Sequence, residues 1–95
     1  MTIIRATLSF EDLKQMAGRL FGDMVKAVVD VDRELLAVDA ELHADLEAGL
    51  LEDGSQQKSL WGINLRPSQG NRSRSVEDEA IRKKIIAIVK KRIAR

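Results

Sequence analysis

The 95-residue sequence contains no cysteine, no tyrosine and a single proline, and only 3 % of its residues are aromatic. The absence of cysteine excludes disulfide bonds, thiolate nucleophiles and cysteine-ligated zinc or iron–sulfur centres. The scarcity of aromatic rings leaves little from which to build a stacking platform for the bases of a single-stranded nucleic acid. With 44 % hydrophobic residues the chain is too apolar for a disordered tail, and its length favours one domain over residues 1–95.

The sequence also lacks the run of about 18 apolar residues that a transmembrane helix requires. Arg5, Glu11 and Asp12 interrupt any apolar core of a signal peptide near the N-terminus. We therefore expect a soluble cytoplasmic protein that has no membrane partner.

The two parts of the chain carry opposite charge. Residues 1–65 contain six basic and twelve acidic residues, a net charge of −6, whereas residues 66–95 contain ten basic and three acidic ones, a net charge of +7. Two explanations stay open. Either the C-terminal third binds an external anion, or the two parts pair with each other within the fold or between two subunits.

The first half of the chain predicts a strand, a helix and a hairpin. Residues 2–7 are β-prone, and Ser9 is placed to cap a helix that Gly22 ends. Residues 24–38 read as a β-hairpin, with a continuous helix as the alternative because the turn lacks Asn-Gly. The apolar stripe of the predicted helix consists of Phe10, Leu13, Met16, Ala17 and Leu20.

The second half predicts a helix, a strand and a last helix. Residues 40–52 form a helix that Asp39 caps, with Leu42, Leu46 and Leu50 as its apolar stripe. Residues 56–59 are a polar linker. Residues 60–65 form a strand with Leu60, Gly62 and Asn64 on one face and Trp61, Ile63 and Leu65 on the other.

Two further features belong to this half. Gly62 permits close approach of another backbone, and Ser75 is placed to cap the last helix. The apolar stripe of the last helix is Ile81, Ile85, Ile88, Val89 and Ile93, and four lysines, Lys83, Lys84, Lys90 and Lys91, lie on the opposite face. The predicted order is β-α-β-β-α-β-α. This order indicates an α+β fold, a small, mainly antiparallel sheet of about four strands with about three helices.

Three segments resemble a small uncharacterised prokaryotic family classed as a domain of unknown function. They are Glu-Leu-His-Ala-Asp at 41–45, Leu-Trp-Gly-Ile-Asn at 60–64 and Arg-Pro-Ser-Gln-Gly-Asn-Arg-Ser-Arg at 66–74. The resemblance covers nearly the whole chain and implies no established activity. It also implies a further strand between the second and third segments. Two alternatives stay open: either this chain lacks a hairpin of roughly 15–25 residues between Leu65 and Arg66, or those residues are absent from the printed sequence.

The arginine-rich segment 66–74 is the first candidate site, because it precedes a predicted helix N-terminus whose free N–H groups and dipole favour an anion. Arginine adds donors suited to phosphate or carboxylate. The alternative is that Arg72 and Arg74 pair with acids of residues 39–53. The residues of the predicted anion site are Arg66, Ser68, Gln69, Asn71, Arg72 and Arg74.

The second candidate site centres on His43, the only histidine. His43 and Glu47 share a helix face, as do Glu41 and Asp45, so His43 is a candidate general base and His43 with Glu47 a candidate metal pair. A solvated acidic face is the plainer explanation, and Trp61 is expected to anchor the core or an interface.

These features favour an anion-binding or regulatory domain for a phosphate compound, a nucleotide or a nucleic-acid backbone. A small hydrolase with His43 as base and a structural partner protein, pairing as a homodimer, stay open as alternatives. Whether the chain is an enzyme is left undecided. The sequence carries no cofactor motif, and we expect no cofactor.

Overall fold

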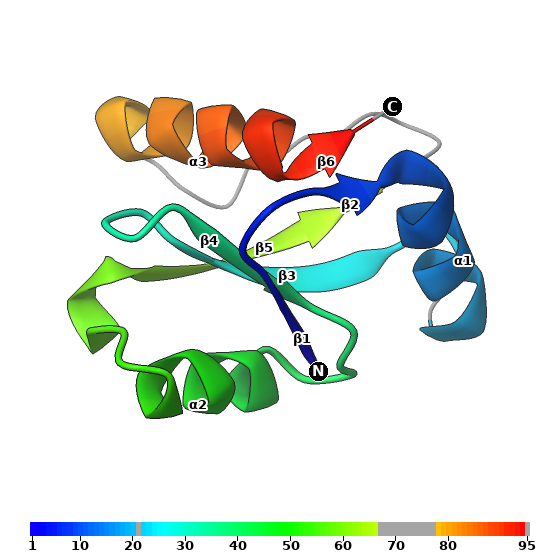
Figure 1. The fold of residues 1–95 in the computed structure, drawn as a ribbon, viewed down its shortest axis with the longest axis horizontal. Coiled ribbons are helices and arrows are strands. Elements are labelled where there is room, and N and C mark those ends of the chain that lie inside the picture. Colours follow the sequence, from blue (N-terminus) through cyan, green and yellow to red (C-terminus); the bar gives the residue numbers. More distant parts are fainter. Residues whose placement is uncertain (21, 67–77, 95) are drawn as a thin grey trace.

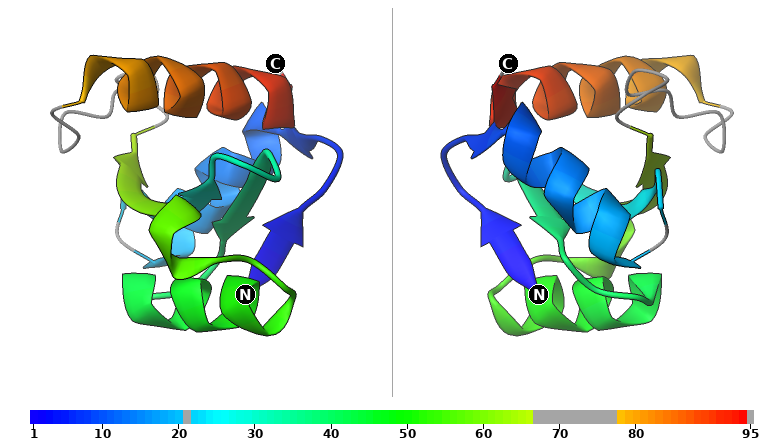
Figure 2. Two further views of the ribbon diagram at one scale, coloured as in Figure 1. Left: turned by 90° about the vertical axis from the view of Figure 1, so that its left-hand side faces the viewer. Right: turned by 90° about the vertical axis from the view of Figure 1, so that its right-hand side faces the viewer.

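The computed structural model describes residues 1–20, 22–66 and 78–94. They form an α+β fold in which a four-stranded antiparallel sheet, in the order β1-β4-β3-β5, lies between helices (Figure 1). Helix α2 covers one face of the sheet, and α1 and α3 cover the other (Figure 2). The predicted class, the four-stranded antiparallel sheet and the three helices are confirmed.

Ten elements follow one another along the described chain. They are β1 (Thr2–Ile4), β2 (Leu8–Ser9), α1 (Phe10–Leu20), β3 (Val25–Asp30), β4 (Leu35–Val38), α2 (His43–Glu52), the 3-10 helix η1 (Gln57–Ser59), β5 (Leu60–Leu65), α3 (Glu79–Arg92) and β6 (Ile93–Ala94). The predicted order lacks β2, β6 and η1. The two-residue strands β2 and β6 pair in parallel, Leu8 with Ile93, so Ile93 lies in a strand and not in the last helix as predicted. Pairs this short leave no periodicity in a sequence.

The predicted hairpin is confirmed, and the alternative of a continuous helix over 24–38 is wrong. Val28 pairs with Ala37 and Asp30 with Leu35, and the turn occupies residues 31–34. The buried carboxylate of Asp30 organises this turn, because its Oδ1 accepts the backbone N–H groups of Asp32 and Arg33, each at 2.9 Å. These hydrogen bonds between the Asp30 side chain and the backbone of the turn stabilise it without the Asn-Gly pair that commonly forms such turns.

Helix α1 begins and ends where its sequence predicts. Ser9 Oγ accepts the backbone N–H of Asp12 at 3.1 Å, as an N-cap does. Gly22, just beyond the helix, has a φ of 84°, a conformation that costs glycine little. Leu13 and Ala17 of the predicted stripe are buried against the sheet.

Helix α2 differs from its prediction at the N-terminus. It begins at His43 with Leu42 as N-cap, and no side chain caps it, so the predicted cap at Asp39 is wrong. Asp39 lies before the helix with a φ of 70°. Leu42 is 56 % exposed because it precedes the helix, whereas Leu46 and Leu50 are fully buried. Glu41 also lies outside the helix, so the expected Glu41–Asp45 pair on one helix face does not form.

Helix α3 begins later than predicted. Its N-cap is Asp78, whose Oδ1 accepts the N–H groups of Ala80 at 2.9 Å and Ile81 at 3.2 Å, and the helix starts at Glu79. The predicted cap at Ser75 is therefore wrong. Both residue types are good cap formers, and Asp78 is the one whose carboxylate accepts the free N–H groups of the first turn. Ile85, Ile88 and Val89 are buried, as the predicted stripe requires.

The sheet separates two apolar clusters. The alternation of β5 is confirmed, since Ile63 and Leu65 belong to the cluster under α1 and α3, and Leu60 to the cluster under α2. Trp61 is half-buried against the first cluster, as an anchor residue would be. Val28 and Val29 of the central strand β3 lie on opposite faces and are both fully buried. The described core is therefore split into two layers by β3 and β4.

A charged cluster ties the end of α2 to the sheet. Asp53 is 2.5 Å from the guanidinium of Arg5 and 2.9 Å from that of Arg33, which also donates to the Ser55 hydroxyl at 2.8 Å. The hydrogen bond from Arg5 is the main cause that lowers the pKa of the Asp53 carboxyl below its ordinary value, and the hydrogen bond from Arg33 adds to it.

Candidate functional site: the lysines of helix α3

The exposed side of α3 carries four lysines in two rows. At about 100° per residue, Lys83 and Lys90 fall on one line along the helix, the outer row, and Lys84 and Lys91 on a second line, the inner row. In each row the two lysines stand about 10 Å apart along the axis, at a rise of about 1.5 Å per residue. All four are exposed, as expected for the face opposite the isoleucines.

The inner row faces the β3–β4 turn. Lys91 Nζ donates to Glu34 Oε1 at 2.9 Å, and this hydrogen bond, together with the ammonium charge, lowers the pKa of the Glu34 carboxyl. Arg92 donates to the carbonyl oxygens of Glu34 and Arg5, each at 2.8 Å. The Lys91–Glu34 ion pair joins the basic third of the chain to the acidic part, so some of the expected pairing between the two parts is present.

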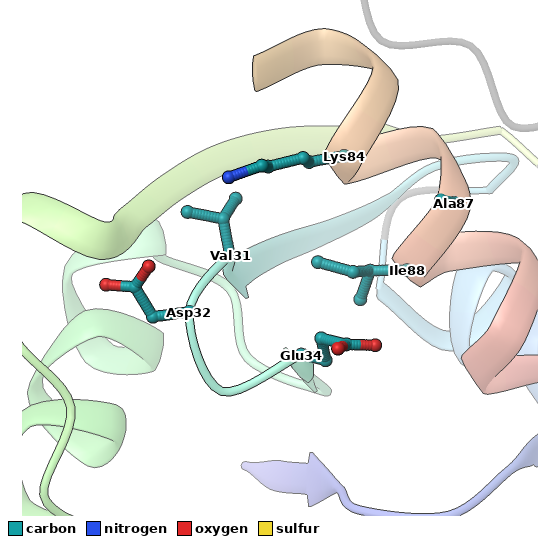
Figure 3. A pocket seen from close by; sticks show the side chains of 6 residues that line it. All are labelled: Val31, Asp32, Glu34, Lys84, Ala87 and Ile88. Carbon is teal, nitrogen blue, oxygen red and sulfur yellow. The ribbon is translucent and has the colours of Figure 1, made fainter. Parts of the chain in front are cut away.

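A groove of about 430 Å³ opens between the inner row and the turn (Figure 3). Lys84 and Ile88 extend from α3 toward the turn, and the side chain of Lys84 runs above Val31 (Figure 3). On the turn side lie the carboxylates of Asp32, which accepts a hydrogen bond from the Ser59 hydroxyl, and of Glu34. The sequence analysis missed this groove, because its two walls come from residues 31–34 and 84–88, which are at least 50 positions apart and which only packing brings together.

The outer row has weak internal partners. Lys83 lies 3.8 Å from Glu79 on the same helix, and the two side chains are 77 % and 79 % exposed. An exposed pair of this kind contributes little to stability. Within the described part of the chain, Lys90 and Lys84 form no ion pair with any carboxylate.

The predicted anion site lies mostly outside the described residues. This holds for Ser68, Gln69, Asn71, Arg72 and Arg74, whose roles stay predictions. Arg66 is described: it follows β5, is exposed, and its guanidinium lies 3.7 Å from the sulfur of Met24. A thioether is a weak acceptor that carries no charge, so the positive charge of Arg66 is not neutralised by this contact.

His43 has a clear packing role. Its Nε2 lies 2.9 Å from the carbonyl oxygen of Ile63, and its ring lies against Gly62. On this face of the sheet Gly62 therefore meets an imidazole and not the second backbone that its sequence position suggested. Because a carbonyl only accepts, the neutral ring carries its proton on Nε2, and a base would have to use Nδ1. In the described structure no nucleophilic side chain is hydrogen-bonded to His43.

The described residues contain no group of three or more His, Asp or Glu side chains close enough together to hold a metal ion. His43 and Glu47 thus have no third ligand among these residues. The same ranges contain no helix with the length and hydropathy needed to cross a bilayer.

The fold and this surface define a small α+β domain with helices on both faces of its sheet and exposed lysines gathered on one helix. The model of a family described as a protein of unknown function, DUF5674, matches residues 2–67 and 63–92. The chain belongs to this family. No curated protein and no solved structure matches the chain. The two matched stretches overlap at residues 63–67, close to the junction of Leu65 and Arg66, where the missing hairpin stays a prediction.

Proposed function

We propose that this chain is an anion-binding domain whose ligand is the phosphate backbone of a nucleic acid, held by the lysines of α3. The observation that supports the proposal is the outer row. Lys83 and Lys90 extend from an exposed helix face, and among the described residues their only carboxylate contact is that of Lys83 with the solvent-exposed Glu79. Their charges are available to an external polyanion.

The charge balance supports the same function. Residues 66–95 carry a net charge of +7, and the ion pair of Lys91 with Glu34 offsets one positive charge. Arg92 binds neutral carbonyl oxygens, which leave its charge in place. An excess of this size on one helix and its flanking segment attracts an anion over several ångströms.

The spacing of the lysines favours an extended anion over a small one. A single phosphate is held by several donors that converge on it, whereas the two outer-row lysines stand about 10 Å apart on an open surface. With few aromatic rings, the contacts fall on phosphates and not on stacked bases, so binding is expected to be independent of sequence. The predicted site residues Arg66, Arg72 and Arg74 are expected to extend this surface, because they lie in the segment of the sequence that joins β5 to α3.

The test is a titration of fluorescent single- and double-stranded oligonucleotides at several salt concentrations. The variant Lys83→Ala/Lys90→Ala is compared with the control Lys14→Ala/Lys58→Ala, which removes the same charge from exposed positions on α1 and η1. We expect the outer-row variant to lower the slope of log affinity against log salt by about 2, at about 0.9 per lost phosphate contact, and the control to keep the native slope.

Two other results would decide against this function. Equal losses in both double variants would mean that net charge alone acts, without a site. No binding by the native chain at low salt would leave the structural-partner alternative, whose arginines hold the fold together. A third variant, Arg72→Ala/Arg74→Ala, tests the role of these two arginines. A reduced affinity for the oligonucleotide would show that they belong to the binding site. A reduced stability without any effect on affinity would show that they hold the fold together. Among the described residues, His43 contacts the backbone of Gly62 and Ile63 and no nucleophilic side chain, which gives the hydrolase alternative no support.

A further inference from the structure

With respect to the described residues, the outer edge of β5 carries backbone groups that have no partner. β5 is the last strand of the sheet, and in the left view of Figure 2 it forms one lateral border while β1 forms the other. The Val31 N–H donates to the Ser59 carbonyl at 3.0 Å, and the same register pairs Val29 with Trp61 and Ala27 with Ile63. In an antiparallel ladder every second pair of residues exchanges backbone hydrogen bonds. The pairs of Trp61 and Ile63 with β3 are therefore the bonded ones, and the pairs of Gly62 and Asn64 with β3 are the non-bonded ones.

The alternation therefore directs the N–H and C=O groups of Gly62 and Asn64 away from β3. Within the described chain, neither residue's backbone makes a hydrogen bond on that side. Gly62 and Asn64 are both exposed, and glycine has no side chain to obstruct an approaching backbone.

The edge also lacks the features that protect the edges of sheets from further pairing. Monomeric proteins place charges, proline or bulges on exposed edge strands, or keep these strands very short. β5 has six residues, Leu-Trp-Gly-Ile-Asn-Leu, none of them charged and none a proline. At the opposite edge, β1 has only three residues.

We propose that β5 pairs with β5 of a second copy of this chain, joining two four-stranded sheets into one of eight strands. A twofold axis at Ile63 sets Gly62 of one copy opposite Asn64 of the other, and each pair exchanges two backbone hydrogen bonds. The second copy is the occupant the strand fits, because an antiparallel edge is complementary to itself and an uncharged one meets no like charge.

This arrangement has a consequence for the lysine surface. The twofold axis is perpendicular to the sheet, so each copy keeps its faces on the same side. Both α3 helices then lie on one face of the joined sheet, and their outer rows form a single, longer basic surface. The dimer itself is held by backbone hydrogen bonds and not by charge, so it is expected to persist at salt concentrations that release a polyanion.

The test is sedimentation equilibrium of the native chain from micromolar to millimolar concentration, at low and high salt. We expect a reversible dimer of twice the chain mass of 10.6 kDa. Asn64→Pro removes an outward N–H from each copy without touching the ladder to β3, and should raise the dissociation constant at least about tenfold. Asn64→Thr, which keeps the N–H, should leave it unchanged.

A second pair of variants keeps the test decisive if the proline disturbs the fold. Asn64→Lys places a charge on the β5 edge and should weaken the dimer, whereas Thr2→Lys places the same charge on the β1 edge and should not. A monomer at every concentration would overturn the proposal. So would a dimer that both Asn64→Pro and Asn64→Lys leave intact, or one that Thr2→Lys dissociates.

Discussion

The imidazole of His43, the first residue of α2, lies directly against the backbone of Gly62 in β5. A Cβ placed on Gly62 would come within 3.3 Å of His43 Cδ2, which is closer than carbon atoms usually approach. The same ring bonds the carbonyl oxygen of the neighbouring Ile63 at 2.9 Å. Since no side chain caps α2, this contact fastens the start of the helix to the sheet.

This contact predicts that Gly62→Ala and His43→Ala are energetically coupled. The added methyl group should displace the ring and cost about 1 kcal/mol of stability, and that cost should largely vanish once His43 is alanine. A double-mutant cycle from urea unfolding should then give a coupling energy of about 0.5 kcal/mol or more. Additive effects of the two substitutions would show that the ring does not depend on the missing Cβ.

Substitution by alanine should have a large effect on stability at Leu46 and a small one at Leu42. Leu46 is fully buried under the sheet, so Leu46→Ala should lower the free energy of unfolding by about 2–5 kcal/mol. Leu42 precedes the helix and is 56 % exposed, so Leu42→Ala should change it by at most about 0.5 kcal/mol. Similar losses of stability in both variants would show that Leu42 is packed like Leu46, as the apolar stripe predicted from the sequence requires.

The Asp53 cluster predicts a loss of stability in acid. The carboxyl has a lowered pKa in the folded protein, so its contribution is present above the unfolded value near 3.8 and is lost as the pH falls through the folded pKa. Asp53→Asn should therefore destabilise the protein near neutral pH and matter progressively less in acid. Unfolding by urea at several pH values measures this difference, with Glu52→Gln, a neighbouring exposed residue, as the control. A difference that does not change with pH would contradict the ionic role of Asp53.

The cap of α3 gives a fourth prediction. Asp78→Ala removes the acceptor of two backbone N–H groups and should cost about 1 kcal/mol. Asp78→Asn keeps an oxygen in the same place and should cost less. Thermal unfolding followed by circular dichroism measures both variants. If Asp78→Ala is as stable as the native chain, the helix is capped elsewhere, and the upstream Ser75 becomes the candidate.

Local patterns in this sequence predicted the structure well, whereas the starts of α2 and α3 and the pairing of distant segments were not predictable. The hairpin, the faces of β5 and the stripe of α3 were predictable, because alternation and helical spacing are local properties that burial then enforces. The caps at Asp39 and Ser75 were predicted wrongly. Helix α2 begins at His43 without any side-chain cap, and α3 is capped by Asp78, which has the same capping propensity as the predicted residue, so propensity alone does not fix where a helix begins. The parallel pair of Leu8 with Ile93 had no local signal, since its partners lie at opposite ends of the chain.

The sequence by itself determined the longer helices and strands and the separation of charge: a chain with a basic C-terminal third, an α+β pattern and no cysteine. Only the tertiary structure decided which charges are used internally. Glu34 and Lys91 are 57 residues apart, and the ion pair between them exists because α3 crosses the β3–β4 turn. Pairing across that distance depends on the order of the strands and the position of the helix on the sheet. These are set by burial of apolar faces over the whole chain, and no local pattern of residues encodes them.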